Sequence, residues 1–192
     1  MLMRDCDSSS ALGIQARGLL PKLLCLVALL APFQKAAAEL VLVTCAPGTN
    51  SVTFEPGLTH TPQDVFITGQ STYGICATVV GDPVTSATWS IGPVLFPGNS
   101  CDNFFSSYRS VITVQWNTGE TSTILFNTTK LQVQGTTAAF VQTGTVTAGK
   151  YVGNRAVQTI TYLNEDLENG CTAPSGLTRL DGPATLTIAT LL

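Results

Sequence analysis

Charged side chains are scarce in this sequence. Asp, Glu, Lys and Arg make up 11% of the 192 residues, and nine basic against twelve acidic residues give a formal net charge of −3. A chain with so few cations has no basic patch to neutralise a phosphate backbone, which excludes nucleic-acid binding as a function. The length is that of one domain rather than of a multidomain assembly.

Groups that move protons at neutral pH are equally scarce. His60 is the only histidine, and it lies in a Thr- and Pro-rich stretch that predicts a solvated loop. The sequence has no G-x-S-x-G motif, and no pair of carboxylates stands out as an acid and base pair. We therefore expect a protein that is not an enzyme. A pocket holding His60 with a carboxylate would reverse that expectation.

No apolar run is long enough to span a bilayer. The longest, Leu23–Ala31, is about nine residues, whereas a membrane-spanning helix needs about 20. It follows the basic residues Arg4, Arg17 and Lys22 and precedes the small residues 36–38, which is the order of a secretory signal peptide. We predict a signal peptide over residues 1–38 and a single secreted domain over residues 39–192, with no stable membrane anchor after cleavage.

The four cysteines of the predicted domain lack the spacing of a metal site. Six cysteines are present, and those beyond residue 38 are Cys45, Cys76, Cys101 and Cys171. No two have C-x₂₋₄-C spacing, so we expect no zinc and no other cofactor. An even number in an exported chain predicts two disulfides. Three pairings are possible; we favour Cys45–Cys76 with Cys101–Cys171, because sequential strands are usually neighbours.

Acidic residues cluster once, between Asn164 and Gly170. Oxygen-bearing side chains alternate there as at the start of a calcium loop. However, glycine falls at the seventh position rather than the sixth, and Ser175 stands where such a loop needs glutamate. We expect a solvated loop and no metal site, with calcium near Asp166 as the open alternative.

What the sequence does have is threonine, valine and glycine in alternating patterns. In Ile112–Trp116, apolar residues alternate with Thr and Gln, and turn signals such as Pro97-Gly98-Asn99 separate similar runs. The pattern predicts an all-β fold. We expect an immunoglobulin-like antiparallel β-sandwich of about eight to ten short strands. The 25-residue span from Cys76 to Cys101 around Trp89 is too tight for a true immunoglobulin domain.

The segment from Gly92 to Tyr108 lacks periodicity and is the longest predicted loop. Phe104, Phe105 and Tyr108 are aromatic anchors of the kind that dominate interfaces, and a bridged Cys101 would hold the loop's end. We predict a binding surface at these three aromatic residues. The alternative is a loop that folds over the edge of the core.

Four short motifs stand out beyond residue 44: Cys45-Ala46-Pro47-Gly48-Thr49, Pro56-Gly57-Leu58-Thr59, Trp116-Asn117-Thr118-Gly119 and Gly144-Thr145-Val146-Thr147-Ala148-Gly149. With these motifs the chain resembles small exported actinomycete proteins of uncharacterised function, and the resemblance covers most of the chain from Cys45 to Leu192. It implies export and a β-sandwich, and it transfers no catalytic residue.

These observations favour a non-catalytic, secreted, extracellular or cell-surface binding or structural module. Its partner would be an unknown extracellular protein or polysaccharide. A carbohydrate-binding module needs a row of exposed aromatic rings, and a protease inhibitor needs a rigid, protruding loop beside a disulfide. Both remain alternatives.

Overall fold

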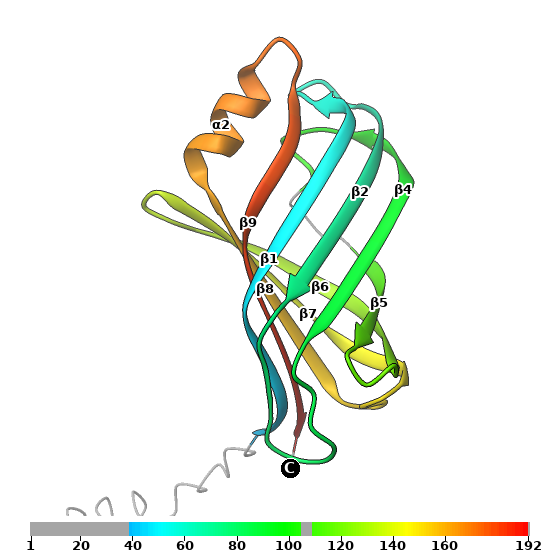
Figure 1. Ribbon diagram of the computed structural model, residues 1–192. Helices are drawn as coiled ribbons and strands as arrows, with labels where there is room; N and C mark the ends of the chain where they lie inside the picture. The colour runs from blue at the N-terminus through cyan, green and yellow to red at the C-terminus, as the bar shows by residue number, and fades with distance from the viewer. Residues whose placement is uncertain (1–38, 105–108, 192) are drawn as a thin grey trace, which may run out of the picture. The chain divides into compact units, whose positions relative to one another are not determined.

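A computed structural model of the chain describes residues 39–104 and 109–191, which form strands and one helix (Figure 1). In chain order these are β1 (Glu39–Leu58), β2 (Gln63–Tyr73), β3 (Cys76–Thr78), β4 (Ala87–Asn99), β5 (Ser110–Trp116), β6 (Thr121–Gln134), β7 (Thr137–Gly149), β8 (Arg155–Leu163), α2 (Asn164–Thr172) and β9 (Leu177–Leu191). The predicted signal peptide lies outside the described residues and stays a prediction.

The strands close into an eight-stranded antiparallel barrel. Hydrogen-bonded neighbours run in the order β2, β4, β5, β6, β7, β8, β9, β1, and β1 then pairs with β2 to complete the ring. The short β3 pairs with β1 outside this ring. The all-β prediction is confirmed, whereas the immunoglobulin-like sandwich is wrong, because the strands surround one interior instead of forming two facing sheets.

The inner face of the barrel is the apolar half of each alternating strand. Along β2, buried and exposed residues alternate strictly from Asp64 to Tyr73, and β8 buries every second residue from Ala156 to Tyr162. Alternation follows from the pleat, which sends successive side chains to opposite faces. It specifies that one face is buried but not whether the sheet closes on itself.

Two strands are longer than the turn signals suggest. β1 runs for 20 residues through Pro47 and Pro56, and β4 continues to Asn99, through the first eight residues of the predicted loop that begins at Gly92. Register shifts at these places let the strands absorb residues that would break a regular ladder.

Both predicted disulfides form, with the favoured pairing. Cys45 and Cys76 are directly opposite one another on β1 and β3. Cys101, just after β4, is bonded to Cys171 near the end of α2. The second bond connects segments 70 residues apart and holds the helix beside the loop that follows β4.

The acidic segment is a helix rather than the expected loop. Glu165 and Asp166 lie in the first turn of α2, where the positive end of the helix dipole favours carboxylates. Leu167 and Cys171 are its buried residues. Among the described residues, no group of three or more His, Cys, Asp or Glu side chains could hold a metal ion.

The barrel is tightly filled toward one end. Trp116 is buried there, donates from Nε1 to Ser122 Oγ at 2.9 Å and meets the ring of Tyr151 edge-on at 5.5 Å between centroids. Ile124 and Leu186 are fully buried in the same core. In the part of the chain that the structure describes, no helix is long and apolar enough to cross a membrane.

The ring of strands is incomplete along one line. β4 and β5 pair only through Ala87 with Trp116 and Thr88 with Gln115, and beyond Thr88 they separate. Pro93 and Pro97 lie at the two register shifts of β4 against β2, and neither has an N–H to donate. The line along which β4 and β5 are unpaired is called the seam below.

Candidate ligand-binding cavity

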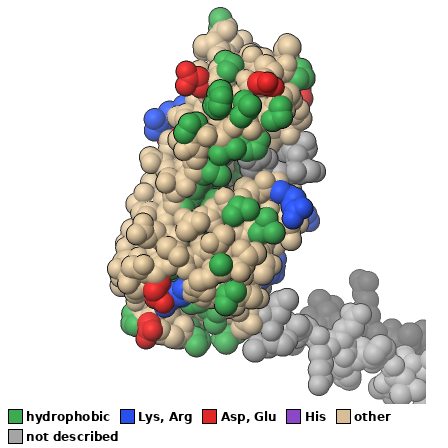
Figure 2. Space-filling model, turned by 90° about the vertical axis from the view of Figure 1, so that its right-hand side faces the viewer, with side chains coloured by type: hydrophobic (Ala, Val, Ile, Leu, Met, Phe, Trp, Pro, Cys, Tyr) green, Lys and Arg blue, Asp and Glu red, His purple; other side chains and the backbone are tan. Residues whose placement is uncertain are grey.

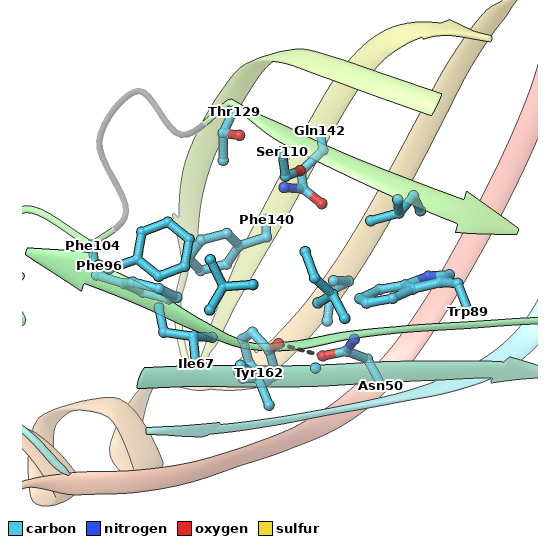
Figure 3. A pocket seen from close by; sticks show the side chains of 16 residues that line it. Asn50, Ile67, Trp89, Phe96, Phe104, Ser110, Thr129, Phe140, Gln142 and Tyr162 are labelled. Carbon is cyan, nitrogen blue, oxygen red and sulfur yellow. Dashed lines mark hydrogen bonds between the residues drawn. The ribbon is translucent and has the colours of Figure 1, made fainter. Parts of the chain in front are cut away.

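A cavity of about 100 Å³ lies inside the barrel, next to the seam. Its walls come from β1, β2, β4, β5, β6, β7 and β8, together with Phe104 from the loop after β4. Figure 3 shows the lining side chains, with the three phenylalanines Phe96, Phe104 and Phe140 at one end and Trp89 at the other. The lining is mostly apolar, with a few polar groups, which is the usual composition of a small-molecule site.

A missing side chain creates part of this space. Gly69 occupies an inward position of β2, between the inward residues Ile67 and Ser71. Unlike them, it has no side chain to place in the interior of the barrel. A Cβ built on Gly69 would lie 3.4 Å from Ile91 Cγ2 and 3.5 Å from a ring atom of Trp89. The backbone of β2 therefore forms the cavity wall at this point, facing the indole ring.

Aromatic rings close one end of the cavity. Phe104 meets Phe54 edge-on at 5.0 Å between centroids and Phe140 at 6.4 Å, and Phe140 meets Tyr162 at 5.8 Å. Edge-to-face contacts in this range are favourable for aromatic pairs. The Cys101–Cys171 bond, three residues before Phe104, holds this loop against the barrel.

A hydrogen-bonded pair forms one side of the cavity. The Tyr162 hydroxyl donates to Asn50 Oδ1 at 2.6 Å (Figure 3), and Asn50 Nδ2 donates to Ser71 Oγ at 2.9 Å and to the Gln70 carbonyl at 3.1 Å. Burial raises the pKa of Tyr162 well above its ordinary value, and the negative charge of Asp181 raises it further. This hydroxyl is therefore neutral at physiological pH.

The opposite side is a second polar wall, made of uncharged side chains. Ser110, Thr129 and Gln142 line the cavity from β5, β6 and β7. Gln142 is directly opposite Thr129 on one neighbouring strand and Gln158 on the other. Gln158 is fully buried, and neither its Nε2 nor its Oε1 has a hydrogen-bond partner among the described residues.

The seam connects the cavity with the surface. Trp89, Ile91 and Phe96 line it from β4, and Ile112 lines it from β5, so residues on both sides of the seam reach the interior. Figure 2 looks at this side of the molecule and shows hydrophobic side chains along a hollow in the surface.

The described lining of the cavity is uncharged. None of its described lining residues is Asp, Glu, Lys, Arg or His, and none is a free cysteine. Among the described lining residues, Tyr162 is the one that titrates, and its raised pKa keeps it protonated. The arrangement can enclose an apolar group and form hydrogen bonds with a neutral polar group attached to it.

The predicted site residues fall in different places. Phe104 packs against the core and lines the cavity, as in the alternative in which the loop folds over the core edge. Phe105 and Tyr108 lie outside the described residues, so the predicted binding surface of three aromatics stays a prediction. The four cysteines form the two disulfides.

His60 has a partner that the sequence did not indicate. Its Nδ1 lies 2.9 Å from Asp102 Oδ1, and both side chains are more than half exposed. The pair lies on the surface and does not line the cavity. A solvated loop histidine, as expected, is therefore what the structure shows, although with a carboxylate beside it.

A platform of aromatic rings for sugars is not visible in residues 39–104 and 109–191. Of the large hydrophobic side chains that are exposed there, Phe66 alone is aromatic. The other members of that set are aliphatic, such as Val79 and Leu95.

Sequence reasoning missed the residues that make the cavity. Gly69 breaks the apolar series Val65, Ile67, Gly69 in β2, but a glycine in a strand indicates a bulge as readily as a gap. Pro93 and Pro97 indicated a loop, although they also signal a strand with an unpaired edge. Gln142 and Gln158 give no signal in sequence, because only strand pairing brings them together.

Comparison with protein-family models, with curated proteins and with solved structures finds no match for this chain. What the barrel does therefore has to follow from its own geometry.

Proposed function

We propose that this protein is a non-catalytic binding protein whose barrel takes up a small apolar molecule through the seam between β4 and β5. The observation that carries the proposal is the apolar cavity beside an unpaired line of the barrel wall. Eight-stranded barrels are wide enough either to be filled by side chains or to hold one small ligand. Here side chains fill most of the interior, and the cavity of about 100 Å³ remains among them.

The cavity limits the size of the enclosed group. A cavity of 150 Å³ lined by apolar side chains holds benzene, which has six non-hydrogen atoms, so about 100 Å³ suits about four. A longer molecule would extend into the seam. At the ceiling of about 1.5 kcal/mol per non-hydrogen atom, a fragment of four atoms gains about 6 kcal/mol, so its Kd is no tighter than about 40 μM.

Export fits this role. Two disulfides are compatible with an oxidising, extracellular environment. The predicted signal peptide and the resemblance to exported actinomycete proteins support secretion. We therefore place the binding function outside the cell.

Trp89 provides a direct test. It is one of only two tryptophans, and it lines the cavity, whereas Trp116 is buried in the filled part of the barrel. Titration with the n-alkanols from butanol to decanol should change the indole fluorescence in a saturable manner. The change should disappear in Trp89→Phe. An unchanged spectrum across the whole series, together with no heat of binding by calorimetry, would remove the proposal.

Filling the space at Gly69 should block binding. Valine suits a strand, and its methyl groups would extend beyond a Cβ that already meets Ile91 Cγ2 at 3.4 Å and the Trp89 ring at 3.5 Å. We expect Gly69→Val to weaken alkanol binding by about tenfold or more, because the cavity volume is lost. Calorimetric titration gives the affinity, and thermal unfolding checks that the barrel still folds.

The control is Gly74→Val, since a Cβ at Gly74 would have no atom within 4 Å. It should bind alkanols as the unmodified protein does. If valine at position 69 prevents folding, Gly69→Ala serves instead, because its Cβ would meet Ile91 and Trp89 at ordinary contact distances. Unchanged affinity in a folded Gly69 variant would place the ligand elsewhere.

A further inference from the structure

We infer that the group enclosed by the cavity is uncharged and carries a hydroxyl, carbonyl or amide that hydrogen-bonds to the side chain of Gln142. This inference rests on the proposed function and specifies the chemistry of its ligand. It follows from the two polar walls of the cavity, which differ in the hydrogen-bond donors and acceptors that remain free for a ligand.

The absence of charge in the lining excludes an ion from the interior. No described lining residue carries a charge that could pair with a carboxylate or an ammonium. Burying an ion without a partner is far less favourable than burying a neutral polar group. Asp181, whose negative charge acts on Tyr162, makes the site still less suited to an anion.

The nearest cations in the sequence lie outside. Arg109 directly precedes the lining residue Ser110, and Lys130 directly follows the lining residue Thr129. Both basic residues are exposed. They could meet a charged group at the rim of the seam, but not one inside. A charged molecule held in that way would not depend on Gln142.

The wall formed by Asn50 and Tyr162 has no donor left for a ligand. Both hydrogens of the Asn50 amide are donated, to Ser71 and to the Gln70 carbonyl. The Tyr162 hydroxyl donates its hydrogen to Asn50. This wall holds the barrel together and gives shape to the cavity.

The wall that contains Gln142 has hydrogen-bonding groups that a ligand can use. Gln142 is on the inner face of β7 and lines the cavity with its side chain. An amide offers two donors and an acceptor with two lone pairs, so it bonds hydroxyl, carbonyl and amide groups equally well. Ser110, on the same side of the cavity, adds a hydroxyl.

Gln158 provides an independent indication of a polar occupant. It projects from the inner face of β8, directly opposite Gln142, and is fully buried with both amide atoms unpaired. Buried amides without partners are rare because each unmade hydrogen bond is unfavourable. Gln158 does not line the cavity itself, so a polar ligand group would bond to Gln142, and Gln142 is the neighbour that could give Gln158 a partner.

The test compares neutral and charged ligands of equal length in Gln142→Leu. The probes are the tightest-binding n-alkanol together with the alkanamide, the alkanoate and the alkane of the same chain length, at pH 8. We expect the alkanol and alkanamide to bind the unmodified protein at least about a hundredfold more tightly than the alkanoate. Gln142→Leu should weaken both neutral polar probes by about tenfold and leave the alkane unchanged. Gln132→Leu, an exposed glutamine on the β6–β7 hairpin, is the control and should change nothing.

Each failure has its own signature. If none of the four probes binds, the proposed function is wrong. If the alkanoate binds as tightly as the alkanol, or if Gln142→Leu weakens the alkane as much as the alkanol, the probes bind but the inference is wrong. If Gln142→Leu does not fold, Gln142→Met replaces it, with the same two criteria.

Discussion

Single side chains, present or absent, set the shape of the interior. Gly69 leaves a gap on β2 where its neighbours Ile67 and Ser71 point inward, and Trp89 faces that gap. Asn50 and Tyr162 brace the same region with a buried hydrogen bond between strands far apart in the sequence. The inward positions of β2 could be read from the sequence by alternation. That one of them is a glycine facing an indole could not, because the contact is between strands.

The buried tyrosines give the stability an alkaline limit. Burial raises the pKa of both Tyr162 and Tyr73, so each stays protonated in the folded barrel at a pH where it ionises in the unfolded chain. Their contribution is fully present below the ordinary tyrosine pKa of about 10 and is lost as pH rises above it toward the raised values. Lys150, whose pKa is raised by the hydrogen bond to Glu120, acts in the same direction.

We therefore expect the free energy of unfolding to fall steadily between pH 10 and 11.5. Each buried tyrosine contributes a slope of at most about 1.4 kcal/mol per pH unit. Urea unfolding at a series of pH values measures it. Tyr162→Phe should be less stable at pH 8, because Asn50 Oδ1 loses its donor, yet show a shallower alkaline slope. An equal slope in the variant would mean that Tyr162 does not stay protonated in the fold.

At the scale of elements, β4 departs furthest from expectation. The sequence indicated a loop from Gly92 onward, since Gly92, Pro93 and Pro97 are turn residues. The structure continues the strand to Asn99 with a partner on one side only. Prolines mark a strand with a free edge as readily as a loop, and only the pairing partner distinguishes the two.

The helix α2 is a second element that the sequence indicated as a loop. Nine residues with two buried positions, Leu167 and Cys171, leave too short a pattern to separate a helix from an acidic loop. The disulfide pairing, in contrast, was predicted correctly. For Cys45 and Cys76 the reason is local, since these cysteines lie on paired strands.

Entry through the seam can be tested by linking its two sides. Continuing the register from Thr88 and Gln115 places Ser90 opposite Thr113, and both are exposed. Ser90→Cys with Thr113→Cys, joined by a short bis-maleimide, should slow alkanol association strongly in stopped-flow measurements of Trp89 fluorescence. The control joins cysteines at positions 88 and 115, where β4 and β5 are already paired, and should leave the rate unchanged. Equal rates in the two linked proteins would show that ligands enter at an end of the barrel instead.

At the scale of the whole molecule, closure of the sheet is the feature that alternation alone could not supply. A sandwich and a barrel bury the same half of every strand, so their sequences share the same period. The pairing of β1 with β2 decides between them, and it joins residues such as Val52 and Gly69 across a short connection. Closure surrounds an interior, and the unpaired stretch of β4 leaves that interior accessible.

The most direct test of the account is a site-resolved map of ligand contacts. In a methyl-labelled sample, two-dimensional NMR spectra recorded during titration with the best alkanol would report each Ile, Leu and Val separately. The account predicts saturable shifts for Ile67, Ile91, Ile112 and Ile160, which line the cavity, and small or no shifts for Val43 and Leu186 in the filled end. Shifts confined to exposed methyls such as those of Val79 and Val133, with the cavity isoleucines unchanged, would contradict it.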